Sequence, residues 1–93
     1  MNITLSPQAL DWVNREFAPN GKNVRIYVKY GQSALHPGFT LGMTVESPRD
    51  VIVSQSFGDV TLFIKADDIW YFNDQNLYIH FDEKSEDVIF DIK

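Results

Sequence analysis

Two histidines and one aspartate are the side chains best suited to hold a metal ion in this chain. His80 and Asp82 lie in a segment that alternates apolar and polar residues, as a β-strand does. Residues i and i+2 of a strand point to the same face about 6.5–7 Å apart, so these two side chains share a face. Imidazole with carboxylate suits iron, zinc or manganese, and His36 is a third candidate ligand. Two ligands on one strand are too few, and the alternative is an ordinary polar strand face.

A loop between two strand-like segments is the second candidate site. It has the sequence GQSALHPG and is too long for a tight turn. Binding residues gather on loops that a rigid scaffold holds, so the candidate ligand-binding residues are Gly31, Gln32, Ser33, His36 and Gly38. The alternative for the histidine is a solvent-exposed loop residue, because nothing nearby in the sequence completes a ligand set.

Known catalytic motifs are missing from the sequence. It contains no P-loop, no glycine-rich dinucleotide motif after a strand, no G-x-S-x-G and no H-E-x-x-H. A serine nucleophile would need a histidine base, and neither histidine lies in a recognisable motif. The sequence therefore predicts a protein without enzymatic activity.

The chain has 93 residues and no cysteine. This length predicts one domain over residues 1–93. Without cysteine, disulfides and thiolate metal sites are excluded, and a small protein without such cross-links is typical of the reducing cytoplasm. The first residues show no basic segment followed by an apolar run, and no apolar stretch reaches about 18 residues. We therefore expect a cytoplasmic protein with no signal peptide and no membrane contact.

The net charge of −5 is unevenly distributed. Residues 1–58 carry five basic and four acidic groups, whereas residues 59–93 carry three basic and nine acidic groups. An acidic half repels phosphate backbones, so nucleic-acid binding is not expected. The simplest role of the acidic half is a solvated face.

The helix and strands that position these residues are predicted from the spacing of apolar residues along the sequence. Ser6 is a suitable N-cap and Pro7 a suitable first residue for a helix over residues 6–18, which Pro19 ends. From Asn23 onward the period is that of strands, with at most one helical turn near residues 67–72. Strands are predicted at residues 24–30, 39–45, 51–53, 60–65, 77–82 and 88–92.

The fold class predicted is α+β, mostly β: one N-terminal helix packed on a largely antiparallel sheet of six to seven short strands, since short turns join the strands. We expect the following side chains to be largely buried: Leu10, Val13, Phe17, Val24, Ile26, Val28, Leu41, Met43, Leu62, Ile64, Leu77 and Ile79. Three consecutive aromatics, Trp70, Tyr71 and Phe72, cannot all face one core. At least one of them should lie near the surface or against a neighbouring chain.

The order of elements and several local phrases resemble the HesB-like family of A-type iron–sulfur biogenesis domains. The resemblance rests on ITLSP at residues 3–7 before an amphipathic helix, and on the strand at residues 24–28 that leads into a glycine-led loop. It also rests on the return strand at residues 39–42, and on residues 69–72 followed by a polar turn and Leu77. It covers nearly the whole chain and implies a HesB-like fold.

The cysteine signature of that family is absent here. Its first cysteine follows a Gly-Gly pair in the loop, where this chain has Gly31, Gln32 and Ser33. Its other two cysteines form Cys-Gly-Cys in a C-terminal tail, whereas this sequence ends at Lys93, and Tyr78 takes the place of a usual acidic residue. The resemblance is therefore to a cysteine-less branch. Serine is a poor ligand for iron at neutral pH, so the cluster-carrying activity does not transfer.

The sequence leaves two functions open, and an enzyme is kept as a third only because a fold does not exclude one. The first is a non-enzymatic accessory protein, related to iron–sulfur cluster biogenesis proteins, that contacts a protein or a small ligand near the 31–38 loop and needs no cofactor. The alternative is a protein that binds iron or another divalent metal through His36, His80 and carboxylates. The oligomeric state, the partner and the ligand do not follow from the sequence.

Overall fold

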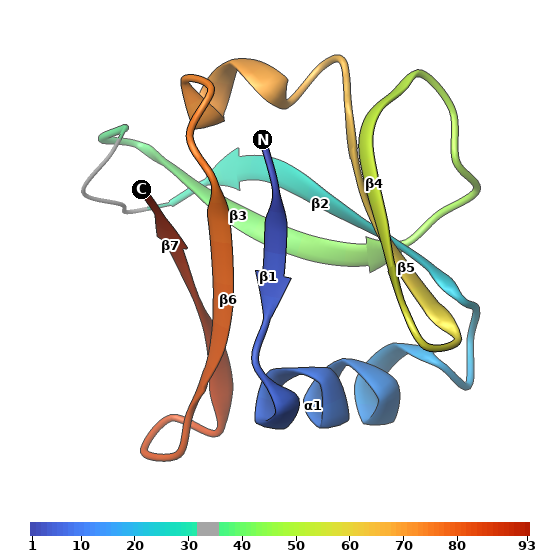
Figure 1. The fold of residues 1–93 in the computed structure, drawn as a ribbon. Coiled ribbons are helices and arrows are strands. Elements are labelled where there is room, and N and C mark those ends of the chain that lie inside the picture. The colour runs from blue at the N-terminus through green and yellow to red at the C-terminus, as the bar shows by residue number, and fades with distance from the viewer. Residues whose placement is uncertain (32–35) are drawn as a thin grey trace.

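The computed structural model describes residues 1–31 and 36–93. Seven strands, one α-helix and one 3-10 turn follow one another along the chain (Figure 1). They are β1 (Ile3–Leu5), α1 (Pro7–Phe17), β2 (Asn23–Tyr30), β3 (Phe39–Val45), β4 (Val51–Phe57), β5 (Val60–Lys65), η1 (Ile69–Phe72), β6 (Leu77–Asp82) and β7 (Asp87–Ile92). The predicted α+β, mostly β fold class is confirmed. Among the described residues, no helix is both long and apolar enough to cross a membrane.

Helix α1 begins where the capping residues predict. The Ser6 hydroxyl accepts a hydrogen bond from the backbone N–H of Ala9 at 3.2 Å, and Pro7 occupies the first turn. The helix buries Ala9 and Val13 and packs against β6 and β7. Its apolar stripe therefore finds the sheet partner that amphipathic spacing requires.

The strands form two sheets and not one. One sheet has the order β1-β6-β7 and the other the order β3-β2-β5-β4. The three antiparallel pairs, β2–β3, β4–β5 and β6–β7, join neighbours in the chain, as the short turns predict. The pairs β1–β6 and β2–β5 are parallel and join strands that are remote in sequence. The spacing of apolar residues within one strand does not reveal such pairings. Parallel partners are joined by long connections, so they are not neighbours in the sequence.

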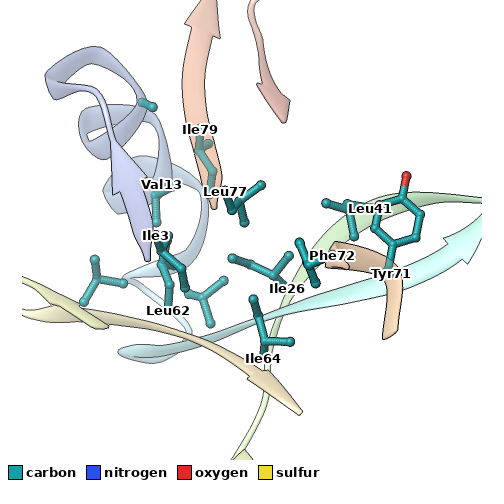
Figure 2. Packing of buried hydrophobic residues seen from close by; sticks show 13 residues of the cluster. Ile3, Val13, Ile26, Leu41, Leu62, Ile64, Tyr71, Phe72, Leu77 and Ile79 are labelled. Carbon is teal, nitrogen blue, oxygen red and sulfur yellow. The ribbon is translucent and has the colours of Figure 1, made fainter. Parts of the chain in front are cut away.

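Strand β1 is an element that the sequence analysis did not predict. It has three residues, too few to show a period, and its place is decided by pairing with β6. The backbone N–H of Ser6 continues this contact by donating to the Ile79 carbonyl at 3.0 Å. Ile3, the first residue of β1, is buried in the core (Figure 2).

The core lies between the two sheets, and most of the predicted residues form it. Figure 2 shows Ile26, Leu62 and Ile64 of one sheet approaching Leu77 and Ile79 of the other. Four predicted core residues are only half-buried: Leu10, Phe17, Val28 and Met43. Each packs against the core and also lines a groove that opens on the surface, so these four are less buried than the other eight. The structure also buries six hydrophobic residues that were not predicted: Ile3, Ala9, Val60, Phe63, Tyr71 and Phe72.

Candidate functional site

Three aromatic side chains meet on the surface beside the candidate loop. Tyr30 ends β2 and Phe39 begins β3, directly opposite each other in the strand register. Their rings stack with centroids 5.7 Å apart, and the edge of Trp70 meets Phe39 at 5.6 Å. Tyr30 is 89% exposed and Trp70 47% exposed. We call Tyr30, Phe39 and Trp70 the aromatic patch.

The base of the loop is closed by its two glycines. The backbone N–H of Gly31 donates to the Gly38 carbonyl at 3.1 Å. A Cβ at Gly31 would lie 2.5 Å from the Thr40 methyl group, and Gly38 has a φ of 90°. Gly38 therefore favours glycine for its backbone conformation, and Gly31 because of the close approach of the Thr40 side chain. The other two predicted loop residues, Gln32 and Ser33, lie outside the described residues.

His36 joins the loop to η1. Its Nε2 lies 3.0 Å from the Tyr71 carbonyl oxygen, so the tautomer with a proton on Nε2 donates there. Its ring also packs against Trp70 and Tyr71, with centroids 5.2 Å and 4.8 Å away. Tyr71 itself is buried, while Trp70 faces outward, which confirms that the aromatic run divides between core and surface. His36 therefore joins the segment just before β3 to η1 and to Trp70 of the aromatic patch.

Asp68, the residue just before η1, connects η1 to β2. It is 5% exposed, and one oxygen accepts from the Val28 backbone N–H at 3.2 Å. The other accepts from Arg25 Nη2 at 2.8 Å and Nε at 3.3 Å. The β2–β5 ladder ends at Arg25, so the Asp68 carboxylate takes over beyond the ladder as acceptor for β2. Buried charge is tolerated because it is both paired and hydrogen-bonded.

Two further charges complete this ionic cluster. Glu46 lies 3.1 Å from Arg25 and 3.2 Å from Lys65. Burial acts to lower the pKa of Arg25, but hydrogen bonds to Asp68 and Glu46 outweigh it, so that pKa is raised. The hydrogen bond from Arg25 lowers the pKa of Glu46 despite some desolvation, and Lys65 adds to the effect. The cluster therefore joins β2 and β5 to the residue after β3 and to the residue before η1.

A groove of about 340 Å³ runs along the aromatic patch. Val28 and the aromatic patch give it apolar walls, and the exposed charges Lys29 and Asp67 also line it. An apolar surface with convergent polar groups is typical of binding sites. The arrangement offers contact area and shape.

The predicted metal ligands do not converge. His80 Nε2 lies 2.6 Å from Asp91 Oδ2 on the neighbouring strand β7. Asp82 instead accepts hydrogen bonds within the turn that follows, from Lys84 N at 3.3 Å and Ser85 Oγ at 2.9 Å. Within residues 1–31 and 36–93, no three His, Asp or Glu side chains are grouped as metal ligands. The pairing of His80 with Asp91 depends on the β6–β7 register, which sequence spacing does not show.

Two residues of the candidate site were missed by sequence reasoning. Tyr30 lies in the segment predicted as a strand at residues 24–30 and is not among the predicted site residues, whereas the structure exposes it at the end of that strand. Asp68 was counted only among the acidic residues of the second half. The one signal for it is Arg25, a charged residue within a strand whose opposite face is buried, which needs a carboxylate partner somewhere in the fold.

Comparison with known proteins finds full-length similarity. No family model matches the chain. It is 32% identical over 93 residues to the Bacillus subtilis protein named pyruvate dehydrogenase inhibitor, covering 98% of each chain. It is also 32% identical over 95 residues to an uncharacterized protein of Staphylococcus epidermidis, covering 97% of each.

A solved structure has the same fold. Escherichia coli SufA, which is involved in the biosynthesis of iron–sulfur clusters, superposes with a TM-score of 0.65 and 20% sequence identity. The match covers 100% of this chain and 85% of the SufA chain. At this identity the likeness concerns the fold alone, and it supports the HesB-like fold that the sequence predicts.

Proposed function

Because this chain belongs to the family of the Bacillus subtilis pyruvate dehydrogenase inhibitor, we propose that it inhibits pyruvate dehydrogenase by binding to it. In this proposal the chain is a non-enzymatic protein, and the contact is made by the aromatic patch and the adjoining 31–38 loop. The absence of known catalytic motifs from the sequence is in keeping with a role in binding.

The observation that carries the proposal is the exposure of the aromatic patch. Tyr30 and Trp70 present large apolar rings to solvent, although burying such rings is favourable. Tyr and Trp are the residues most enriched among those that dominate the energy of protein interfaces. Together with Phe39 they form one continuous surface, next to a groove of about 340 Å³ that a side chain of the partner can enter.

The surroundings of the aromatic patch favour binding because they hold it in one arrangement. Trp70 lies in η1, which Asp68 ties to β2 and His36 ties to the loop. Phe39 is fixed by its register with Tyr30 on the neighbouring strand. A surface that is already ordered loses less conformational entropy on association than a flexible one.

The experiment is an inhibition titration with purified components. Pyruvate-dependent reduction of NAD by pyruvate dehydrogenase is measured against increasing concentrations of this protein. The wild-type protein should inhibit in a saturable manner at a defined stoichiometry. Trp70→Ala and Tyr30→Ala should each raise the concentration for half-inhibition by roughly tenfold or more, since hot-spot truncations cost about 2 kcal/mol or more.

A matched control variant tests whether the aromatic patch, and not another exposed apolar residue, makes the contact with pyruvate dehydrogenase. Ile89 is 39% exposed on β7, and its ring-free apolar side chain lies outside the aromatic patch, so Ile89→Ala should inhibit like the wild-type protein. Circular dichroism checks that every variant folds. Absence of inhibition by the wild-type protein would refute the function. Inhibition that Trp70→Ala and Tyr30→Ala leave unchanged would refute the assignment of the surface alone.

A further inference from the structure

Strand β4 is an edge strand with unusual composition. It is the last strand of the β3-β2-β5-β4 sheet, and none of its seven residues is charged. Five of them are exposed, among them Val51 at 37% and Ile52 at 56%. Every second residue of an edge strand directs its backbone N–H and C=O outward, where they can pair with another strand.

The other three edge strands are protected in ways that β4 is not. β1 has only three residues, and β7 carries Asp87 and Asp91, which would repel their counterparts in a second copy. β3 is buried or half-buried along its whole length. The one protective feature of β4 is a shift of register between Val51 and Val53, which leaves the ladder regular from Val53 to Phe57.

We propose that β4 is a dimerisation edge, at which two copies of this chain pair their β4 strands antiparallel about a two-fold axis. Antiparallel pairing of a strand with itself is self-complementary, as a symmetric dimer requires. The chain has a net charge of −5, but β4 itself has no charged residue. Pairing at β4 therefore brings two uncharged strands together. The contact is thus the one at which two acidic chains repel each other least.

Charges at the two ends of β4 complement each other in this arrangement. Arg49 and the exposed Asp50 precede the strand, and Asp59 lies in the turn that follows it. Arg49 is the one of the two that lies as far before β4 as Asp59 lies after it. In an antiparallel pair, the start of one strand lies beside the end of the other, so Arg49 of one copy approaches Asp59 of the second copy on each side of the axis. Both residues are exposed, and within the described part of the chain neither takes part in an ion pair. This complementarity favours a second copy as the occupant of the edge.

The test is sedimentation equilibrium of the full chain over a wide range of concentrations. The wild-type protein should show a monomer–dimer equilibrium, and Ile52→Lys, which places two like charges at the contact, should abolish it. Arg49→Glu and Asp59→Arg should each weaken dimerisation roughly tenfold, because two exposed pairs are changed per dimer. The double variant Arg49→Glu/Asp59→Arg restores both pairs with exchanged sign and should return the dissociation constant toward the wild-type value.

Asn20→Lys, which adds the same charge at an exposed turn outside β4, is the control and should dimerise like the wild-type protein. Circular dichroism checks the fold of each variant, and the charge-swap rescue remains decisive if Ile52→Lys folds poorly. A wild-type protein that is monomeric at every concentration would overturn the proposal. So would a dimer that Ile52→Lys and both single charge variants leave unchanged. A monomer whose inhibition of pyruvate dehydrogenase is lost in Ile52→Lys would assign the edge to that enzyme and likewise overturn pairing with a second copy.

Discussion

Replacing Asp68 by alanine removes the acceptor of three hydrogen bonds in a site that water hardly reaches. Asp68 is 5% exposed, and the two groups that would lose their partner are the Val28 N–H and the Arg25 guanidinium. Breaking a buried ion pair by removing one partner costs about 3–5 kcal/mol. The Arg25 side chain is 19% exposed and keeps its contact with Glu46, so we expect the lower end, about 3 kcal/mol. A domain of this length is stable by about 5–15 kcal/mol, so the loss is a large share of the total.

Two further variants at this site divide the effect into its parts. Asp68→Asn keeps a carbonyl oxygen for the Val28 N–H but removes the charge opposite Arg25, and should cost about 1–2 kcal/mol. Asp67→Ala changes the neighbouring exposed aspartate and should cost less than about 0.5 kcal/mol.

The assay is equilibrium unfolding in urea, followed by tryptophan fluorescence and far-ultraviolet circular dichroism. The free energy of unfolding should fall in the order wild type, Asp68→Asn, Asp68→Ala. Equal stability of Asp68→Ala and Asp67→Ala would refute the argument that a buried carboxylate holds η1 to β2.

Three other predictions concern charge, packing and chemistry. The pKa of Glu46 is lowered in the folded protein, so its contribution to stability is present above its ordinary value of 4.5 and is lost as the pH falls through the lower folded value. Glu46→Gln should therefore reduce the acid sensitivity of urea unfolding below pH 4.5, and equal sensitivity would contradict the role of Arg25. Leu62→Ala should cost about 2–5 kcal/mol in the same assay, because Leu62 is fully buried between the sheets; unfolding like the wild-type protein would place the core elsewhere. Anaerobic reconstitution with iron and sulfide, without added thiol, should leave no stable cluster on the isolated chain, since it has no thiolate. Visible charge-transfer bands that persist after desalting, with matching iron and sulfide, would show the opposite.

The sequence by itself determined the features that depend on neighbouring residues. Ser6 and Pro7 placed the start of α1, because capping is a matter of the first turn alone. The change of period after Gly21 placed most strands close to their observed bounds, and β5 begins and ends where the pattern indicates. β4 is longer than predicted, since it runs to Phe57 and not to Val53. The missing cysteines excluded thiolate chemistry whatever the fold.

The tertiary structure alone decided which remote residues meet. The two parallel pairs divide the strands between two sheets, and these pairings depend on long connections that leave no local period. His80 pairs with Asp91 of β7, which lies diagonally across from it beside Tyr78, whereas Asp82 is engaged within the turn that follows β6. Asp68 meets Arg25 across 43 positions of sequence, and Trp70 of η1 meets Phe39 of β3 close to this ion pair. Spacing along the chain tells which side chains share an element, whereas contact between elements follows from the packing of the whole core.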